Sequence, residues 1–145
     1  MDDISKYLTT QNNYSLISIS MPLLSNLNMV ENIALIKEVI FRVPTKEAQR
    51  VANEFLKKIE LLHISLQRIE NCSNIEIFYV MLIRALMSKE KTIIIESPYL
   101  IIKEIVNITD LMKNINLLNK NKKIVILDIE NNAIHYEGCS CNIIK

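Results

Sequence analysis

Apolar and polar residues follow one another along this chain in patterns that predict helices and strands in turn. The clearest pattern lies over 45–62, where apolar residues recur at helical spacing and charged residues occupy the other face. The apolar residues are Ala48, Val51, Ala52, Phe55, Leu56, Ile59 and Leu62. Upstream, Asn28 is a typical cap for a helix that runs to Phe41. The sequence therefore predicts two helices in succession.

A further helix, predicted over 75–87, is apolar nearly all round. Its apolar residues are Ile75, Ile77, Phe78, Val80, Met81, Leu82, Ile83 and Ala85. Because no polar face remains for solvent, we expect this helix to be deeply buried.

Three segments are predicted to be strands of one short, mostly parallel sheet. Residues 16–20 alternate between apolar and small polar side chains, as a short strand does. Residues 92–96 and 123–127 are apolar, β-branched runs of the kind found in central parallel strands. A helix over about 100–118 joins the last two strands into a right-handed βαβ unit. The predicted fold class is α/β, with a single domain over 1–145.

The two ends of the chain carry less regular patterns. Residues 1–13 are polar and are predicted to be loosely held. Near the other end, Ile134, His135 and Tyr136 are predicted to form a terminal hairpin or sheet edge with Gly138 and 142–144.

The scarcity of glycine restricts the chemistry that this fold can support. Gly138 is the only glycine among 145 residues, where average usage near 7% predicts roughly ten. Loops that hold phosphate through backbone N–H groups need glycine, since a side chain blocks both their conformation and the close approach of the ligand. Neither G-x-x-x-x-G-K-[ST] nor G-x-G-x-x-G can be written in this sequence. We therefore expect no nucleotide loop and no cofactor.

Charge and hydropathy exclude other classes of function. The formal net charge is +1, and the only short basic run, 120–123, is interpreted as a solvated loop, so no nucleic-acid partner is expected. The first residues do not resemble a signal peptide, and no apolar stretch approaches the length of a membrane span. A cytoplasmic protein without direct membrane insertion is the expectation.

The cysteines indicate neither a disulfide framework nor a metal centre. Cys72, Cys139 and Cys141 are an odd number and contain no C-x-x-C pair, which favours reduced thiols in the cytosol. Cys139 and Cys141 lack a second pair that would complete a zinc tetrahedron. No metal is predicted, and Cys72 is interpreted as a structural thiol rather than a reactive one.

Several segments, taken together, resemble the ATPase subunits of ABC transporters. Residues 80–87 read VMLIRALM and 91–98 read KTIIIESP, which is similar to the family's buried helix QRVALARAL and the following strand that ends in DEP. Residues 22–35 are similar to the ALLPNLTVLENVAL stretch after the family's Q-loop, and the helix over 45–62 matches the one that follows. The resemblance covers about 14–130. It implies a partial P-loop NTPase-like domain with an ABC-type helical subdomain over about 28–88.

The positions that carry catalysis in this family are altered here. By the resemblance, the LSGGQ signature falls on 72–76, which keeps Ser73, places Glu76 at its end and loses both glycines. The Walker B aspartate becomes Glu96, and the catalytic glutamate becomes Ser97. These four residues are vestigial positions of a nucleotide site, so no catalytic residue is assigned.

Other family positions have changed as well. The Q-loop glutamine falls on Ile19, the dimer-contacting aspartate on Lys103, and the switch histidine on about Asp128 or Ile129. The Walker A loop precedes the Q-loop by about forty residues in the family, whereas eighteen residues precede Ile19 here. We expect no ATPase activity.

The last third of the chain is open to two interpretations under this resemblance. Residues 123–130 correspond either to the strand that carries the switch histidine or, continuing through 134–138, to the family's closing hairpin, which reads RIVVLDDGKIVYEG. Neither alignment puts a histidine at the switch position.

Each candidate site residue also has an ordinary structural explanation. Glu96 could hold Mg²⁺ at the end of its strand, but without a phosphate-binding lysine we interpret it as a solvated carboxylate. Ser73, Glu76 and Ser97 are interpreted as loop and cap residues. His63 and His135 have no identifiable orienting partner and are assigned surface or packing roles.

The expected function is that of a non-hydrolytic ABC-transporter ATPase-like subunit. It would act as a scaffold or regulator with a membrane permease or a paralogous, intact ATPase subunit. The resemblance is compatible with a dimer and with a peripheral place on the inner face of the cell membrane. In the family, the segment after the Q-loop lines a groove for a helix of the membrane subunit. The corresponding candidate partner-binding residues are Met21, Pro22, Leu23, Leu24, Leu27, Val30 and Ile33. The alternative is a small cytosolic α/β protein-interaction domain unrelated to transport.

Overall fold

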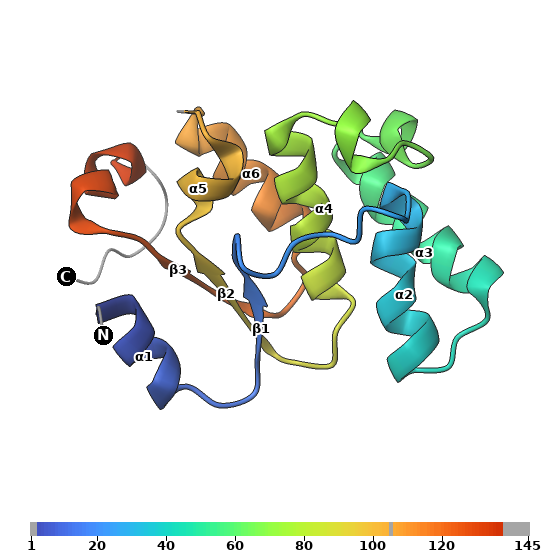
Figure 1. Ribbon diagram of the computed structural model, residues 1–145, viewed down its shortest axis with the longest axis horizontal. Coiled ribbons are helices and arrows are strands. Elements are labelled where there is room, and N and C mark those ends of the chain that lie inside the picture. The colour runs from blue at the N-terminus through green and yellow to red at the C-terminus, as the bar shows by residue number, and fades with distance from the viewer. Residues whose placement is uncertain (1–2, 105, 138–145) are drawn as a thin grey trace.

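Three parallel strands form the centre of the computed structural model, which describes residues 3–104 and 106–137. They are β1 (Tyr14–Ile17), β2 (Thr92–Glu96) and β3 (Lys123–Leu127), in the order β1-β2-β3 (Figure 1). Ile94 pairs with Leu16 on one side and with Val125 on the other. The strands predicted over 92–96 and 123–127 and their parallel pairing are confirmed.

The central strand is buried on both faces. Ile93, Ile94 and Ile95 each have 0% of their surface exposed. Side chains alternate between the two faces of a strand, so the side chain of Ile94 lies on one face of the sheet and those of Ile93 and Ile95 lie on the other. Both faces of the sheet therefore exclude water here. This explains why the sequence of β2 is a continuous apolar run instead of an alternating one.

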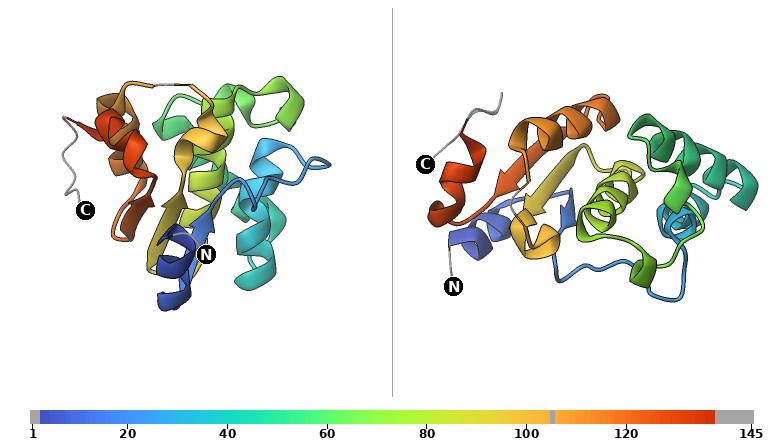
Figure 2. Two further views of the ribbon diagram at one scale, coloured as in Figure 1. Left: turned by 60° about the vertical axis from the view of Figure 1, so that its left-hand side comes forward. Right: turned by 90° about the horizontal axis from the view of Figure 1, so that it is seen from above.

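Helices α2 (Met29–Ile40), α3 (Thr45–Lys58) and α4 (Asn74–Leu86) cluster together, and α4 lies between the sheet and the pair formed by α2 and α3 (Figures 1 and 2). The short 3-10 helices η1 (Leu62–Ile64) and η2 (Ile69–Asn71) connect α3 to α4. In α4, the buried residues are Phe78, Tyr79, Val80, Met81, Leu82, Ile83 and Ala85. Deep burial of this helix, predicted from its apolar sequence, is confirmed. No helix in the described parts of the chain is long and apolar enough to cross a membrane.

The start of α2 follows the sequence signal closely. The Asn28 side chain accepts a hydrogen bond from the backbone N–H of Glu31 at 2.9 Å, and the Glu31 carboxylate accepts one from the N–H of Asn28 at 3.0 Å. This reciprocal pair satisfies two N–H groups that the first helical turn would otherwise leave unpaired.

The first strand and the N-terminal segment differ from the predictions. β1 ends at Ile17 and not at residue 20, because Ser18 leaves the sheet and its hydroxyl accepts a bond from the N–H of Ser20 at 3.2 Å. Residues 1–13 were predicted to be loosely held, but the structure has a helix, α1 (Asp3–Thr10), beside the sheet on the side away from α2 and α3 (Figures 1 and 2). Ile4, Tyr7 and Leu8, at helical spacing, are half-buried and are the signal that this prediction missed.

The single helix predicted over 100–118 is two helices, α5 (Pro98–Ile102) and α6 (Ile108–Leu118). Lys103 ends α5 in the left-handed region, with φ 62°. Asn107 begins α6, because its side chain accepts bonds from the N–H groups of Thr109 at 2.8 Å and Asp110 at 3.3 Å.

The predicted terminal hairpin or edge at 134–136 is wrong. These residues belong to a 3-10 helix, η3 (Glu130–Tyr136), which the hydrogen bond from the Tyr136 hydroxyl to the Asp128 carboxylate holds in place. Gly138 and 142–144 lie outside the described residues.

Among residues 3–104 and 106–137, five residues other than glycine occupy the left-handed region of backbone space: Asn13, Arg42, Glu60, Ser97 and Lys103. Glu60 shows what this means for a helix end. At the end of α3, the N–H of Glu60 bonds to the carbonyl of Lys57 at 3.1 Å and that of Leu61 to the carbonyl of Leu56 at 2.9 Å. This pair of hydrogen bonds is typical of a helix end with glycine at the position that Glu60 occupies here, with φ 61°.

Replacing Glu60 by glycine is expected to stabilise the protein. A residue with a Cβ atom loses about 1 kcal/mol in this conformation, so Glu60→Gly should raise the free energy of unfolding by up to about 1 kcal/mol. Urea denaturation measures the change. Glu38→Gly, inside α2, is the matched control and should lower the stability by about 1 kcal/mol. Equal destabilisation by both changes would contradict the account of this helix end.

Candidate functional site

The carboxyl ends of the parallel strands are where ligands bind in open α/β sheets. Ser18 follows β1, and Asp128 follows β3. Glu96 is the last residue of β2, and Ser97 follows it. We call this set the carboxyl edge. It contains two of the four positions that the resemblance assigns to a nucleotide site, Glu96 and Ser97.

Ser97 turns the chain from β2 into α5. Its backbone is left-handed, with φ 47° and ψ 62°, and its N–H donates to the carbonyl of Leu127 at 2.7 Å. The hydroxyl makes no cap bond to α5. Ser97 therefore joins the ends of β2 and β3 through its backbone, and its side chain lacks the carboxylate that a general base at this place would need.

Asp128 is the most engaged side chain of the carboxyl edge. Its Oδ1 accepts hydrogen bonds from the N–H of Ile129 and from Nδ2 of Asn132, both at 2.8 Å, and its Oδ2 accepts one from the hydroxyl of Tyr136 at 2.7 Å. Three bonds to one carboxylate fix η3 against the end of β3.

An aromatic cluster lies beside this carboxylate. The Tyr99 ring lies 5.0 Å from that of His135 and 6.0 Å from that of Tyr136, measured between centroids. Burial, the hydrogen bond from its hydroxyl to Asp128 and the charge of that carboxylate raise the pKa of Tyr136. Burial and the same charge raise the pKa of Tyr99, whose hydroxyl is buried without a partner among the described residues. Side chains of α5 and η3 thus pack together next to the end of β3.

Sequence reasoning identified Asp128 only as an approximate place for a switch histidine. The bond between Asp128 and Tyr136 depends on η3, a structure that the residue pattern did not predict, so no signal in the sequence pointed to it. His135 packs on Tyr99, in agreement with the packing role expected for it.

The other two positions that the resemblance assigns to a nucleotide site, Ser73 and Glu76, cap the start of α4. The Ser73 N–H donates to Oε1 of Glu76 at 2.8 Å, and the Glu76 N–H donates to Oγ of Ser73 at 3.3 Å. His63 Nε2 lies 3.7 Å from Oε2 of Glu76. These bonds confirm the interpretation of both residues as cap residues, and none of them reaches the carboxyl edge.

The described residues offer no metal site and no activated thiol. Among residues 3–104 and 106–137, no group of three or more His, Cys, Asp and Glu side chains could hold a metal ion. Cys72 is half-buried, and burial together with the charges of Glu76 and Glu70 raises the pKa of its thiol, which disfavours the nucleophilic thiolate. Cys139 and Cys141 lie outside the described residues.

A second candidate site is the loop after β1. Ile19 is 55% exposed, Met21 52% and Leu24 45%, and Pro22 between them is also exposed. We call residues 19–24 the apolar loop. Clustered apolar side chains that face solvent often mark a surface that another molecule covers, so this loop is a candidate contact surface.

Two polar side chains hold the apolar loop in one conformation. Asn32 is 2% exposed; its Oδ1 accepts from the N–H of Leu24 at 2.8 Å, and its Nδ2 donates to the carbonyl of Leu24 at 3.1 Å. Arg84 of α4 donates to the carbonyls of Met21 at 2.7 Å and Pro22 at 3.1 Å. Burial lowers the pKa of Arg84. The loop backbone is therefore fixed to both α2 and α4.

Three of the residues predicted to contact a partner are in the core. Leu23 is 5% exposed, Val30 2% and Ile33 0%, so the prediction that they form a contact surface is wrong. The resemblance pointed to a whole segment, but these three side chains belong to the buried hydrophobic core. Met21, Pro22 and Leu24 are exposed and Leu27 is half-exposed, and these four remain candidates.

Comparison with known proteins identifies the fold. No protein-family model matches the chain, and no curated protein matches it. Among solved structures, the chain is similar to the ATP-binding cassette MJ0796, solved as a dimer in a post-hydrolysis state bound to ADP and Pi, with a TM-score of 0.61 and 20% sequence identity. The match covers 91% of this chain and 59% of that one. The expected fold class, a partial ABC ATPase-like α/β fold with a short parallel sheet, is confirmed.

The bond between Tyr136 and Asp128 predicts a specific dependence on pH. The pKa of Tyr136 is higher in the folded protein than the value of about 10 in the unfolded chain. The stability that follows from this difference is fully present below pH 10 and is lost as the pH rises further, by about 1.4 kcal/mol per pH unit. Tyr136→Phe should lower the free energy of unfolding by about 1.5–3 kcal/mol at neutral pH. Above about pH 10 the difference from the wild type should shrink. Urea denaturation over this pH range measures it, and a constant difference would contradict the assignment.

Proposed function

We propose that this chain is a non-hydrolytic relative of ABC transporter ATPase subunits, which acts as a scaffold or regulator by binding a membrane permease or an intact ATPase subunit. The observation that carries the proposal is the apolar loop, which exposes Ile19, Met21 and Leu24 on a backbone fixed by Asn32 and Arg84. The fold similarity supports the relation to ATP-binding cassettes, and the loop supplies the surface for a partner.

The residues of the carboxyl edge argue against hydrolysis by this chain. Phosphoryl transfer depends on a P-loop lysine, magnesium ligands and a group that orients the attacking water. The 145 residues contain no P-loop motif, and Ser97 occupies the place that the resemblance gives to the catalytic glutamate. Near the switch position, the Asp128 carboxylate is already bonded to Ile129, Asn132 and Tyr136. A scaffold or regulatory role needs none of these groups.

The geometry of the apolar loop suits a helical partner. Helix-in-groove recognition needs a few apolar anchors in a fixed arrangement and no charged chemistry. Binding to a mobile loop costs free energy, because each side chain and each backbone unit has to be ordered. Here Leu23 anchors the loop in the core while Asn32 and Arg84 bond its backbone, so much of this ordering is complete before a partner arrives.

A second candidate function is a protein-interaction domain unrelated to transport, which the same loop would also support. The two proposals differ in the partner. A permease or an intact ATPase subunit keeps the protein at the membrane through another protein, whereas an unrelated partner has no such requirement.

The proposal predicts that Leu24→Asp abolishes partner binding in a folded protein. Truncating an anchor that fills a pocket costs about 1–3 kcal/mol, and a buried charge costs more. Co-purification of the tagged protein with a permease or ATPase subunit, identified by mass spectrometry, measures the effect. Leu117→Asp, on α6 and 50% exposed in the wild type, is the matched control and should bind normally. Leu23→Asp is unsuitable, because Leu23 lies in the core.

Three outcomes would count against the proposal. If the Leu24→Asp variant is folded and binds as well as the wild type, the apolar loop is not part of the interface. Equal loss in both variants indicates a non-specific effect of charge. If the wild type associates with neither a permease nor an ATPase subunit, the transporter role is wrong, and capture of an unrelated partner through Leu24 would favour the interaction domain.

A further inference from the structure

The structure gathers lysines from two distant loops at the amino end of the sheet. Lys89 and Lys91 precede β2, and Lys120, Lys122 and Lys123 precede and begin β3. Lys122 Nζ donates to the carbonyl of Ser88 at 2.7 Å and to that of Glu90, and the N–H of Lys123 donates to the carbonyl of Lys91 at 2.9 Å. The basic run at 120–123 is exposed at Lys120, Asn121 and Lys123, as expected of a solvated loop, and it is also bonded to a second basic loop.

The end of α2 adds exposed apolar side chains to this side of the molecule. Val39 is 64% exposed, Ile40 54% and Phe41 45%. The Lys37 ammonium lies 4.7 Å from the centre of the Phe41 ring, and its charge lowers the pKa of Lys122 in addition to the larger effect of burial. Lys37 is therefore close to both the apolar end of α2 and the lysines of the two loops.

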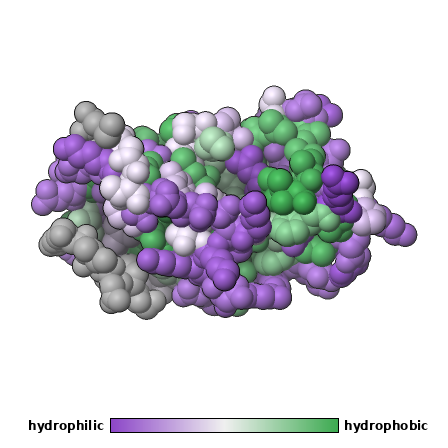
Figure 3. Space-filling model, turned by 90° about the horizontal axis from the view of Figure 1, so that it is seen from below, coloured by the Kyte–Doolittle hydropathy of each residue, from purple (hydrophilic) through white to green (hydrophobic). Residues whose placement is uncertain are grey.

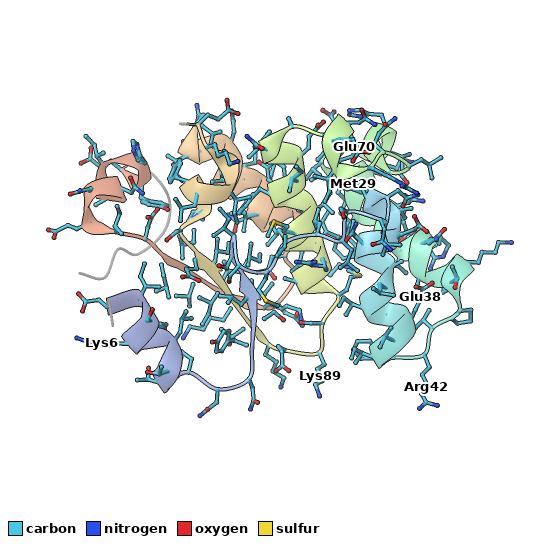
Figure 4. The ribbon with its side chains drawn as sticks, in the orientation of Figure 1. Lys6, Met29, Glu38, Arg42, Glu70 and Lys89 are labelled. Atoms are coloured by element: carbon cyan, nitrogen blue, oxygen red, sulfur yellow. The ribbon has the colours of Figure 1, made fainter. Side chains whose placement is uncertain are left out.

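These lysines and exposed apolar side chains lie on one face of the molecule. We call it the lower face and define it as residues 37–43, 88–91 and 119–123. Lys89 and Arg42 both project downward from it in Figure 4. Seen from below, Figure 3 shows an apolar area over the end of α2 with hydrophilic residues around it. The three segments contain seven basic and two acidic residues, a net charge of +5, while the whole chain has +1.

We propose that the lower face binds the surface of an anionic lipid bilayer. The exposed side chains of Val39, Ile40 and Phe41 would enter the boundary between headgroups and acyl chains, and the surrounding cations would contact lipid phosphates. The combination of exposed apolar side chains and surrounding cations favours a bilayer over other polyanions as the ligand. A nucleic-acid backbone would bind the cations but would leave the aliphatic Val39 and Ile40 in water, whereas a bilayer takes up both. The proposal does not depend on the permease, since it needs lipid alone.

Co-sedimentation with protein-free vesicles tests the proposal. The protein should sediment with vesicles of phosphatidylcholine and phosphatidylglycerol and remain in solution with phosphatidylcholine alone. Raising the salt concentration should weaken the binding, because the cations are solvent-exposed. Lys89→Gln/Lys91→Gln should weaken it by about 25-fold, at about fivefold for each cation removed. Ile40→Ser should weaken it by about fivefold through loss of apolar contact.

Lys57→Gln/Lys113→Gln is the matched control, because it removes the same charge at two exposed positions outside the lower face. It should bind vesicles like the wild type. Equal loss in the two double variants would overturn the proposal, as would the absence of wild-type binding to anionic vesicles or an Ile40→Ser variant that binds unchanged. Tighter binding to a single-stranded RNA that displaces the vesicles would assign the face to nucleic acid instead. Failure of the vesicle test leaves the permease proposal standing, because that proposal is tested at Leu24.

Discussion

Burial of α4 is the interaction on which the other parts of the structure depend. This helix contacts β1, α2, α3 and α5, and its side chains Phe78, Leu82 and Ile83 are fully buried. Its polar groups complete the arrangement: Arg84 bonds the apolar loop, and the hydroxyl of Tyr79 accepts a bond from Asn114 of α6 at 3.0 Å. A helix without a polar face gains stability only when every side is covered, so the sheet and the helical pair have to assemble around it.

The near-absence of glycine is the main support for the proposal that this chain does not hydrolyse nucleotides. Turns that glycine would make are made by Glu60, Ser97 and Lys103, which tolerate the left-handed conformation at a cost. Backbone nests for phosphate have no such substitute, because a Cβ atom prevents close approach of the ligand. The candidate surfaces that the structure does show are built from side chains: the apolar loop and the lower face. Our proposals therefore assign function to these two surfaces.

The sequence predicted those elements whose signal is local. β2, β3 and α4 follow directly from apolar runs and periodicity, and α2 follows from its cap. The missed features join residues far apart in the chain: Arg84 and Met21 are 63 residues apart, and Lys122 and Ser88 are 34 apart. No pattern within a short window reports such bonds. For the same reason, exposure within 21–33 could not be assigned, and Leu23, Val30 and Ile33 were placed on the surface although they complete the core.

The central proposal is that this chain combines an ATP-binding-cassette-like fold with the absence of a working nucleotide site. Calorimetric titration of the folded protein with ATP and Mg²⁺ tests it most directly, because binding is measured without assuming a partner or a turnover rate. The account predicts no saturable binding, since the 145 residues contain no P-loop motif. A dissociation constant in the low micromolar range, with a magnesium dependence that Glu96→Ala abolishes, would contradict it.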